Sequence, residues 1–240
     1  DAQESRGLGD VYKRQEYNSM DTVNLYEDFT YNIGLLEIEK YLLMKYVNKQ
    51  AKILDIGCGC GRATFGMYEI GYRNIVGVDI CENMINKAKE ISKVRNEDII
   101  FLNDNILNIK MKDIDVATFL FNGLMTIPGL ENRKKTVNHI CKILKPSGFF
   151  IFTTPIIPED YDEKVEKINI SRYFKAYRYE YGDRLFDGEY YIHFDCDDDI
   201  VMLCSDLELV ETDVCERICS QKNRGYNLVH RAKYWIFRRR

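Results

Sequence analysis

Several features common in nucleic-acid-binding, membrane and secreted proteins are missing from this 240-residue sequence. Acidic residues outnumber basic ones, 38 to 34, and the net charge of −4 offers no broad basic surface to a nucleic acid or an anionic membrane. No apolar run approaches the ~20 residues that a membrane-spanning helix needs. Internal repeats and low-complexity tracts are also lacking. These absences favour a small-molecule partner, argue against nucleic acid and predict no membrane contact.

The eight cysteines form neither a compact disulfide framework nor a metal-binding pattern. Their scatter through apolar and helical contexts is typical of reduced, mostly buried thiols and predicts a cytoplasmic protein. Cys58 and Cys60 are separated by one residue, whereas paired zinc ligands are usually separated by two, and no histidine pair accompanies them. They could be thiolate ligands with Cys81 as a third, but small residues that fill a tight loop are the favoured interpretation. No metal is predicted.

The length suits one α/β domain with an insertion. The first fifteen residues, DAQESRGLGDVYKRQ, show no helical or strand periodicity and resemble the translation of a sequencing adapter that recurs at the ends of metagenomic reading frames. We therefore expect residues 1–15 to be non-native. We predict an N-terminal helical cap over 16–50 and the main domain over 51–240, with the insertion at about 156–194.

Strand and helix signals alternate along the first two thirds of the chain. Short apolar runs predict strands at 51–56, 74–80, 98–103, 115–121 and 149–155, and amphipathic spacing predicts helices at 32–48, 61–70, 82–94 and 131–144. Pro146 and Gly148 provide a stop signal after the last of these helices. This alternation predicts an α/β fold with a doubly wound, Rossmann-like, mainly parallel sheet.

The pattern changes after Pro155. Residues 156–176 are polar and are predicted to be helical in part. Residues 177–194 predict a β-hairpin with Asp187-Gly188 as its turn dipeptide. The remaining predicted elements are a helix at 197–207 and strands at 208–218 and 232–239.

The stretch ILDIGCGCGRATFG carries the strongest functional signal. In an open α/β sheet, ligands bind at the carboxyl ends of the strands, where Gly57, Gly59 and Gly61 let the backbone turn tightly ahead of a helix N-terminus. The spacing is G-x-G-x-G, not the G-x-G-x-x-G of dinucleotide-binding folds, and Asp55 would repel a pyrophosphate. A carboxylate suits a positively charged ligand, and S-adenosylmethionine bears an ammonium and a sulfonium but no phosphate.

Three further strand ends carry residues suited to other parts of the same ligand. Asp79 can accept hydrogen bonds from both ribose hydroxyls. Asp104 can accept one from the exocyclic amine of adenine, and a backbone N–H of one of the next two residues can meet the ring. Phe121 and Asn122 would lie beside the methionyl part. The full predicted cofactor-binding set is Asp55, Gly57, Gly59, Gly61, Arg62, Asp79, Ile80, Asp104, Asn105, Ile106, Phe121 and Asn122.

Five segments together resemble a class I S-adenosylmethionine-dependent methyltransferase: LDIGCGCGRAT, GVDIC, NDNILNI, FLFNGLMTIPG and LKPSGFFIFTT. The resemblance covers residues 32–155, and the tail is more weakly similar to bacterial members whose substrates are generally unassigned. It implies a seven-stranded sheet whose last strand, here 232–239, is antiparallel. It also implies that Asp55 and the three glycines hold the methionyl end of the cofactor, Asp79 the ribose and Asp104 the adenine.

The resemblance implies direct SN2 transfer of the sulfonium methyl group to a nucleophile. Because the leaving group is a neutral thioether, alignment of donor and acceptor is the main requirement. A general base is needed only for an alcohol or an ammonium acceptor. No residue is marked as that base; His193 and Tyr181 are the candidates, with a hydrogen-bonded structural role as the alternative for His193.

Other functions remain open from the sequence. An NAD-type oxidoreductase would use the same fold class, although Asp55 and the glycine spacing argue against it. A non-catalytic module would bind the adenosine ligand without turnover, and an RNA or protein acceptor is disfavoured by the acidic balance. The tyrosines between residues 173 and 191 could form an aromatic wall for an amine substrate, but mutual packing within the hairpin is favoured for most of them. The acceptor and the oligomeric state are left open.

Overall fold

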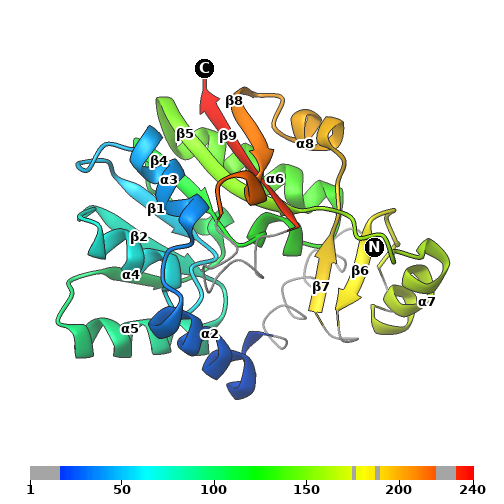
Figure 1. Ribbon diagram of the computed structural model, residues 1–240, viewed down its shortest axis with the longest axis horizontal. Helices are drawn as coiled ribbons and strands as arrows, with labels where there is room; N and C mark the ends of the chain where they lie inside the picture. The colour runs from blue at the N-terminus through cyan, green and yellow to red at the C-terminus, as the bar shows by residue number, and fades with distance from the viewer. Residues whose placement is uncertain (1–16, 175–176, 187–189, 220–230) are drawn as a thin grey trace.

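All five strands predicted in the first two thirds of the chain belong to one seven-stranded sheet in the computed structural model (Figure 1). The structure describes residues 17–174, 177–186, 190–219 and 231–240. The strand order is β3-β2-β1-β4-β5-β9-β8, and β1 to β5 are parallel. The bounds are β1 Ile53–Ile56, β2 Ile75–Asp79, β3 Ile100–Asn103, β4 Ile114–Phe119, β5 Leu144–Pro155, β8 Leu207–Val214 and β9 Ala232–Arg239. The predicted doubly wound α/β fold is confirmed.

The last strand, β9, is antiparallel to both of its neighbours, as predicted. It lies between β5 and β8, so both of its edges are hydrogen-bonded. Its central residue Trp235 is buried, stacks on Phe152 and donates a hydrogen bond from Nε1 to Thr154 Oγ1 at 2.9 Å. A strand covered on both faces needs apolar residues at successive positions, which explains the run YWIF.

Both faces of the sheet are covered by apolar clusters. Ile53 of β1 and Ile236 of β9 belong to one buried cluster, whereas the next residues, Leu54 and Phe237, belong to another. Successive side chains of a strand point to opposite faces, so each strand contributes to both clusters. This two-sided burial leaves the strand ends as the place where polar residues gather.

Helices and short 3₁₀ turns connect the strands. The α-helices are α2 Met20–Asn32, α3 Glu37–Tyr46, α4 Arg62–Glu69, α5 Glu82–Arg95, α6 Leu130–Ile143, α7 Glu163–Tyr173 and α8 Asp197–Leu203. The 3₁₀ turns are η1 Ile106–Asn108, η2 Gly123–Thr126 and η3 Cys215–Arg217. Among the described residues, no helix is both long and apolar enough to cross a membrane.

Several predicted boundaries are wrong: α8 ends before the predicted residue 207, β8 ends before the predicted residue 218, and two others have a clear backbone cause. The helix predicted over 32–48 is α3 alone, because Gly34 has a φ of +63° and separates it from α2. The strand β5 begins directly after α6, so Pro146 and Gly148 lie inside the strand rather than in a loop before it. The pairing with β4 shifts register there, and such an irregularity accommodates a proline, which cannot donate to a regular ladder.

A second, two-stranded sheet lies apart from the main sheet (Figure 1). It pairs β6, Asp183–Phe186, antiparallel with β7, Tyr190–His193. The predicted turn dipeptide Asp187-Gly188 lies outside the described residues, as does the segment 1–15. Tyr177 and Tyr191 pack with Phe174 in a separate apolar cluster, which agrees with the prediction that most tyrosines of this segment pack against one another. The domain boundaries given above stay predictions.

Candidate functional site

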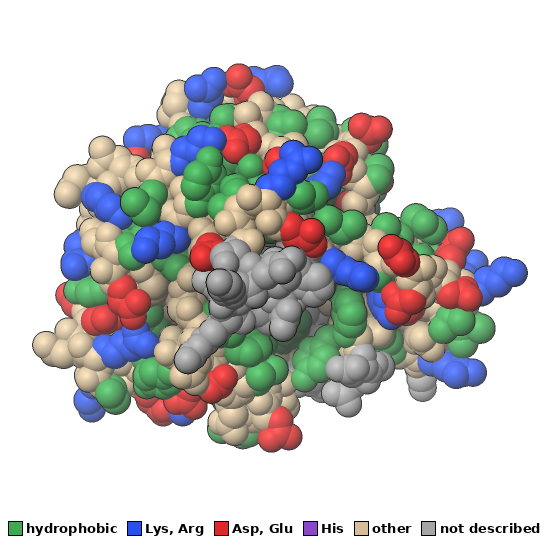
Figure 2. Space-filling model, viewed as in Figure 1, with side chains coloured by type: hydrophobic (Ala, Val, Ile, Leu, Met, Phe, Trp, Pro, Cys, Tyr) green, Lys and Arg blue, Asp and Glu red, His purple; other side chains and the backbone are tan. Residues whose placement is uncertain are grey.

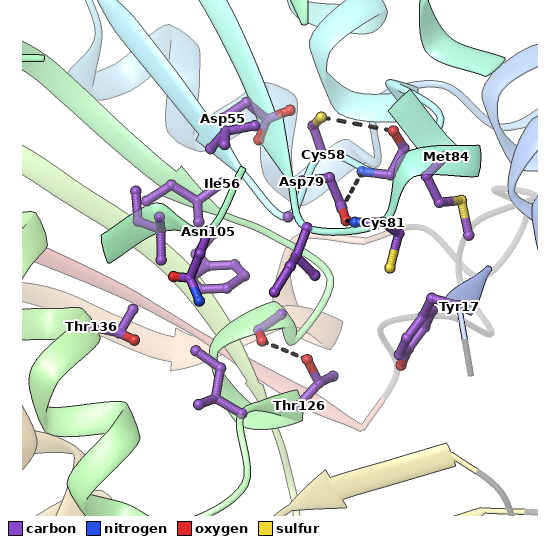
Figure 3. A pocket seen from close by; sticks show the side chains of 18 of the residues that line it. Tyr17, Asp55, Ile56, Cys58, Asp79, Cys81, Met84, Asn105, Thr126 and Thr136 are labelled. Atoms are coloured by element: carbon purple, nitrogen blue, oxygen red, sulfur yellow. Dashed lines mark hydrogen bonds between the residues drawn. The ribbon is translucent and has the colours of Figure 1, made fainter. Parts of the chain in front are cut away.

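A cavity of about 590 Å³ opens where β1, β2, β3 and β4 end. Its volume lies within the ~300–1,000 Å³ range of small-molecule pockets. Figure 3 shows Asp55, Asp79 and Asn105 around it, each from the end of a different strand or the residues after it, with Tyr17 at one end and Thr136 at the other. Ten of the twelve predicted cofactor-binding residues line it: Asp55, Gly57, Gly59, Arg62, Asp79, Ile80, Asp104, Asn105, Ile106 and Phe121.

The two predicted residues outside this lining shape the backbone next to it. Gly61 has a φ of +89° and precedes α4, and an added Cβ would lie 2.7 Å from the ring of Phe65. Asn122 has a φ of +62°, and its backbone N–H donates to Thr153 Oγ1 at 2.8 Å. The structure therefore brings the loops together around the cavity, but these two residues are not part of its lining.

Asp79, at the end of β2, joins two neighbouring loops through its carboxylate. Oδ2 accepts a hydrogen bond from the N–H of Gly59, and Oδ1 accepts one from the N–H of Cys81, both at 2.9 Å. A carboxylate has about four lone-pair sites, so this side chain can accept more than these two hydrogen bonds. The predicted ribose acceptor thus also holds the glycine loop in place, which the sequence pattern did not show.

Asp55, at the end of β1, is almost fully buried. Its Oδ2 accepts a hydrogen bond from Thr64 Oγ1 at 2.6 Å, and its Oδ1 accepts one from Thr118 Oγ1 at 2.8 Å. Burial raises the pKa of Asp55 to about 6, although the two threonine hydroxyls and the charge of Arg62 act to lower it. A positive charge placed beside this carboxyl would relieve the cost of ionising it.

Replacing Asp55 by asparagine tests this buried carboxyl. Between the ~3.9 of an unfolded aspartate and the native pKa of about 6, the folded protein binds more protons than the unfolded chain. The stability of the ligand-free protein, relative to Asp55→Asn, should therefore fall as the pH rises through this window, by ~1.4 kcal/mol per unit of pKa difference. Urea denaturation of both proteins across this window measures the difference. If the free energies of unfolding of the two proteins changed with pH in the same way, the prediction would be wrong.

Arg62 lies in the cavity wall, but its guanidinium is paired with Glu39 of α3. Nη1 donates to Glu39 Oε2 at 2.7 Å and Nη2 to Oε1 at 2.6 Å, and Nη1 also donates to the carbonyl of Gly34 at 2.7 Å. Arg62 therefore fastens α3 to α4 beside the cavity. Sequence reasoning missed Glu39; the available signal is an acidic residue between the apolar positions Ile38 and Leu42 of a helix.

Aromatic rings from α2 and its N-terminal flank cover one side of the cavity. Tyr17 and Tyr26 line it, and their ring centroids are 6.2 Å apart in an edge-on arrangement. Tyr26 also meets the ring of Phe121, the residue after β4, at 6.4 Å. Burial, with a further contribution from the charge of Asp79, raises the pKa of Tyr26, so this side chain stays a neutral phenol.

The residues that follow β3 also line the cavity. Asp104 Oδ1 accepts hydrogen bonds from the N–H of Asn105 and from Asn108 Nδ2, both at 2.7 Å. The lining continues into residues outside the predicted cofactor-binding set: Thr126, Ile127, Pro128, Asn132, Lys135 and Thr136. They come from η2, the residues after it and the first half of α6, and only tertiary packing brings that helix against η1.

Neither candidate base lines the cavity. Tyr181 is 64% exposed, and His193 is buried between Asp183 and Asp195 in and next to the small sheet. The cysteines show no metal-like grouping among the described residues: Cys58 is buried, and burial raises the pKa of its thiol well above the ordinary value. Cys60 packs with its Sγ 3.3 Å from the sulfur of Met84.

Comparisons with known proteins identify relatives of the chain. A family model described as a methyltransferase domain matches residues 47–232. The phosphoethanolamine N-methyltransferase of Plasmodium falciparum is 28% identical over 190 residues, which cover 79% of this chain and 66% of that protein. The human eEF1A lysine and N-terminal methyltransferase is 28% identical over 135 residues, 53% of this chain. The chain thus spans between about a fifth and two thirds of the length of these relatives.

Solved structures share the fold. A S-adenosylmethionine-dependent methyltransferase from Methanosarcina mazei superposes with a TM-score of 0.66 at 18% identity, covering 82% of this chain and 96% of the other. Magnesium protoporphyrin IX methyltransferase from Synechocystis, solved with bound S-adenosylmethionine, gives a TM-score of 0.62 at 12% identity and covers 97% of both chains. The family match spans most of the chain and agrees with the sheet topology. The chain therefore belongs to the methyltransferase domain family, and the predicted resemblance to class I S-adenosylmethionine-dependent methyltransferases is confirmed.

Proposed function

We propose that this chain is a S-adenosylmethionine-dependent methyltransferase whose cavity holds the cofactor and a small-molecule acceptor. The observation that carries the proposal is the convergence of the ends of β1, β2, β3 and β4 on one cavity. Each of these ends contributes a residue suited to one part of the cofactor. No single motif would carry the same weight.

The residues that line the cavity fit this cofactor. Gly57 and Gly59 lie in its wall with φ values of +63° and +55°, and an added Cβ at Gly57 would lie 2.8 Å from the ring of Phe119. The loop therefore lets backbone approach a ligand closely. Asp55 and Asp79 place negative charge beside this loop, which suits an ammonium and hydroxyl groups and disfavours a pyrophosphate.

Each part of the cofactor has a candidate partner. We assign Asp79 to the ribose hydroxyls, Asp104 to the adenine amine, with the backbone of Asn105 or Ile106 at the ring, and the Asp55–Gly59 loop to the methionyl end. When bound, S-adenosylmethionine supplies a methyl group on a sulfonium, ready for displacement by a nucleophile. The protein's own contribution is to hold donor and acceptor in line and to exclude water beneath the rings of Tyr17 and Tyr26.

Among the residues that the structure describes, none of those that line the cavity is a histidine. The ionisable side chains described in the lining are carboxyls, tyrosines, thiols, Lys135 and the ion-paired Arg62. Burial raises the pKa values of Tyr26 and Cys58, so both stay protonated. Such a site suits an acceptor that presents its own lone pair, so that alignment rather than proton removal limits the reaction.

The mixed charge of the surface supports a small-molecule acceptor, as does the size of the cavity. Figure 2 shows Lys and Arg side chains interspersed with Asp and Glu on this face, with no broad basic patch for a nucleic acid. One relative is named for a small amine, phosphoethanolamine, and another for a protein, eEF1A. The chain covers 66% of the first and 19% of the second.

Calorimetric titration with S-adenosylhomocysteine and with NADH tests the cofactor. We expect the first to bind and the second not to, since Asp55 would face the pyrophosphate of NADH. Tight binding of NADH alone would overturn the assignment of S-adenosylmethionine as the cofactor and favour the NAD-type alternative.

A screen for S-adenosylhomocysteine release across metabolite, protein and RNA pools then tests the reaction, with Asp79→Ala as the control for contaminating activity. Release with a metabolite pool supports the proposal. Release with protein or RNA alone would overturn the small acceptor, and binding without release in any pool would indicate a non-catalytic module.

A further inference from the structure

Five charged side chains meet between the small β6–β7 sheet and the start of α6, outside the cavity lining. They are Arg133, Glu180, Asp183, His193 and Asp195. Arg133 is 1% exposed and His193 is 2% exposed. Burying charges is costly unless they are paired and hydrogen-bonded, so this network requires an explanation.

Both ring nitrogens of His193 face carboxylates. Nδ1 lies 2.8 Å from Asp183 Oδ1, and Nε2 lies 2.6 Å from Asp195 Oδ1. A carboxylate only accepts hydrogen bonds and a neutral imidazole has only one donor, so both contacts are satisfied only by the doubly protonated ring. The geometry therefore points to an imidazolium.

The surroundings of the ring favour the same state. Burial lowers the pKa of His193, but the hydrogen bonds with Asp183 and Asp195 outweigh it and leave the pKa above the ordinary value. Burial raises the pKa of Asp195, but its hydrogen bond with His193 leaves that pKa below the ordinary value. The charged or titratable groups around the ring are Asp183 of β6, Tyr191 of β7, Asp195, Arg133 of α6, and Tyr177 and Glu180 before β6.

A divalent cation is the competing explanation for this cluster. One donor atom each from Glu180, Asp183 and His193 lies within 4.8 Å of the others. However, Asp183 already accepts hydrogen bonds from Tyr191 and from the N–H of Glu180, at 2.6 and 2.7 Å. The guanidinium of Arg133 also pairs with Glu180 at 2.9 Å. A metal ion would have to break these contacts and stand beside a positive charge, so a metal site is disfavoured.

The network reaches the cavity through Arg133. Its Nε lies 3.9 Å from Asp195 Oδ2, and neither atom has a hydrogen-bond partner among the described residues. Nη1 donates to the carbonyl of Ile127 at 3.2 Å, and Glu180 accepts from the N–H of Leu130 at 2.9 Å. Ile127 and the next residue, Pro128, line the cavity. The Ile127–Pro128 wall of the cavity is therefore connected to the small sheet by the hydrogen bonds and ion pairs of Arg133 and Glu180.

We propose that His193 is a positioning residue: as an imidazolium between Asp183 and Asp195, it holds Arg133 and thereby fixes the Ile127–Pro128 wall of the cavity. The interaction is present while the ring carries its charge, and it is lost as the pH rises through the pKa of the folded protein. Loss of the proton leaves a ring lone pair facing a carboxylate oxygen, which weakens the attachment of the wall. The consequence for the cofactor rests on the proposed function, whereas the attachment itself does not.

Nuclear magnetic resonance of the full chain tests the attachment without any ligand. The ring nitrogens of His193 should both be protonated at neutral pH and titrate with a midpoint above ~6.5. The backbone amides of Ile127 and Leu130 should shift with the same midpoint. These amides should lose the pH-dependent shift in His193→Gln and keep it in the matched control His139→Gln. In the wild type the ring of His139 contacts the carbonyl of Ile109 and not the network.

A neutral His193 ring at pH 7, or amides of Ile127 and Leu130 that do not follow its titration, would overturn the proposal. These readouts come from the wild-type protein, so a His193→Gln variant that fails to fold leaves them intact. As a second measurement, the affinity for S-adenosylhomocysteine should weaken several-fold across the same pH window in the wild type and in His139→Gln. A pH-independent affinity would contradict the coupling, whereas no binding at any pH would contradict the proposed function alone.

Discussion

Replacing Glu39 by glutamine is expected to lower the free energy of unfolding by about 3–5 kcal/mol, the typical cost of removing one partner of a buried ion pair. Glu39 is 1% exposed and makes a two-pronged contact with Arg62. The variant leaves the guanidinium of Arg62 buried without its hydrogen-bonded counter-charge. Urea denaturation of the wild type and the variant at neutral pH measures the difference.

Two controls separate charge burial from a general effect of substitution. Glu208 pairs with Arg238 at 2.8 Å, but their side chains are 48% and 44% exposed, so Glu208→Gln should cost no more than ~1 kcal/mol. The double variant Glu39→Leu with Arg62→Met removes both charges and should lose less stability than Glu39→Gln. A Glu39→Gln variant as stable as Glu208→Gln would show that the Glu39–Arg62 pair is not desolvated.

Replacing Asp79 by alanine is expected to weaken the affinity for S-adenosylmethionine by ~1.5–3 kcal/mol, roughly 10- to 150-fold. The carboxylate is the assigned acceptor for the ribose hydroxyls, and hydrogen bonds to a charged group are typically worth this much. It also accepts from the N–H groups of Gly59 and Cys81, so the variant loosens the loop that approaches the ligand. Calorimetric titration measures the loss.

Asp79→Asn serves as the matched control for this loop. Asparagine keeps one acceptor oxygen and nearly the same shape, so it should retain part of the loop geometry and lose less affinity than alanine. Thermal unfolding of both variants without ligand separates loop stability from ligand contact. Wild-type affinity in the alanine variant would remove Asp79 from the cofactor site.

The elements of this fold could be predicted because their signals are local. The apolar runs of β1, β2 and β3 and the helical spacing of α5 depend on neighbours within a few residues. The predicted boundaries were wrong where a residue with positive φ separates two helices, as at Gly34, or where a strand continues through a register shift, as at Pro146 in β5. Neither feature has a periodic signal in the sequence.

The site divides in the same way. Asp55 and Asp79 lie near the ends of predicted strands, and Asp104 follows one. Parallel strands end at one edge of a sheet, so the sequence alone predicts that these acids lie close together. The partners that hold the site are distant in the chain: Glu39 for Arg62, and Asp183 and Asp195 for the ring of His193. His193 was a candidate base on sequence grounds, and its two carboxylate partners mark it instead as a buried charge outside the cavity lining.

The sequence by itself determined the parallel α/β sheet, the glycine loop and the acidic strand ends, because periodicity and motif spacing are properties of adjacent residues. Only the tertiary structure decided which charges are buried together, which rings cover the cavity and how the β6–β7 sheet is attached to its wall. The physical reason is that the energy of a charge depends on its burial and on partners that folding brings near, and the neighbouring residues in the sequence determine neither.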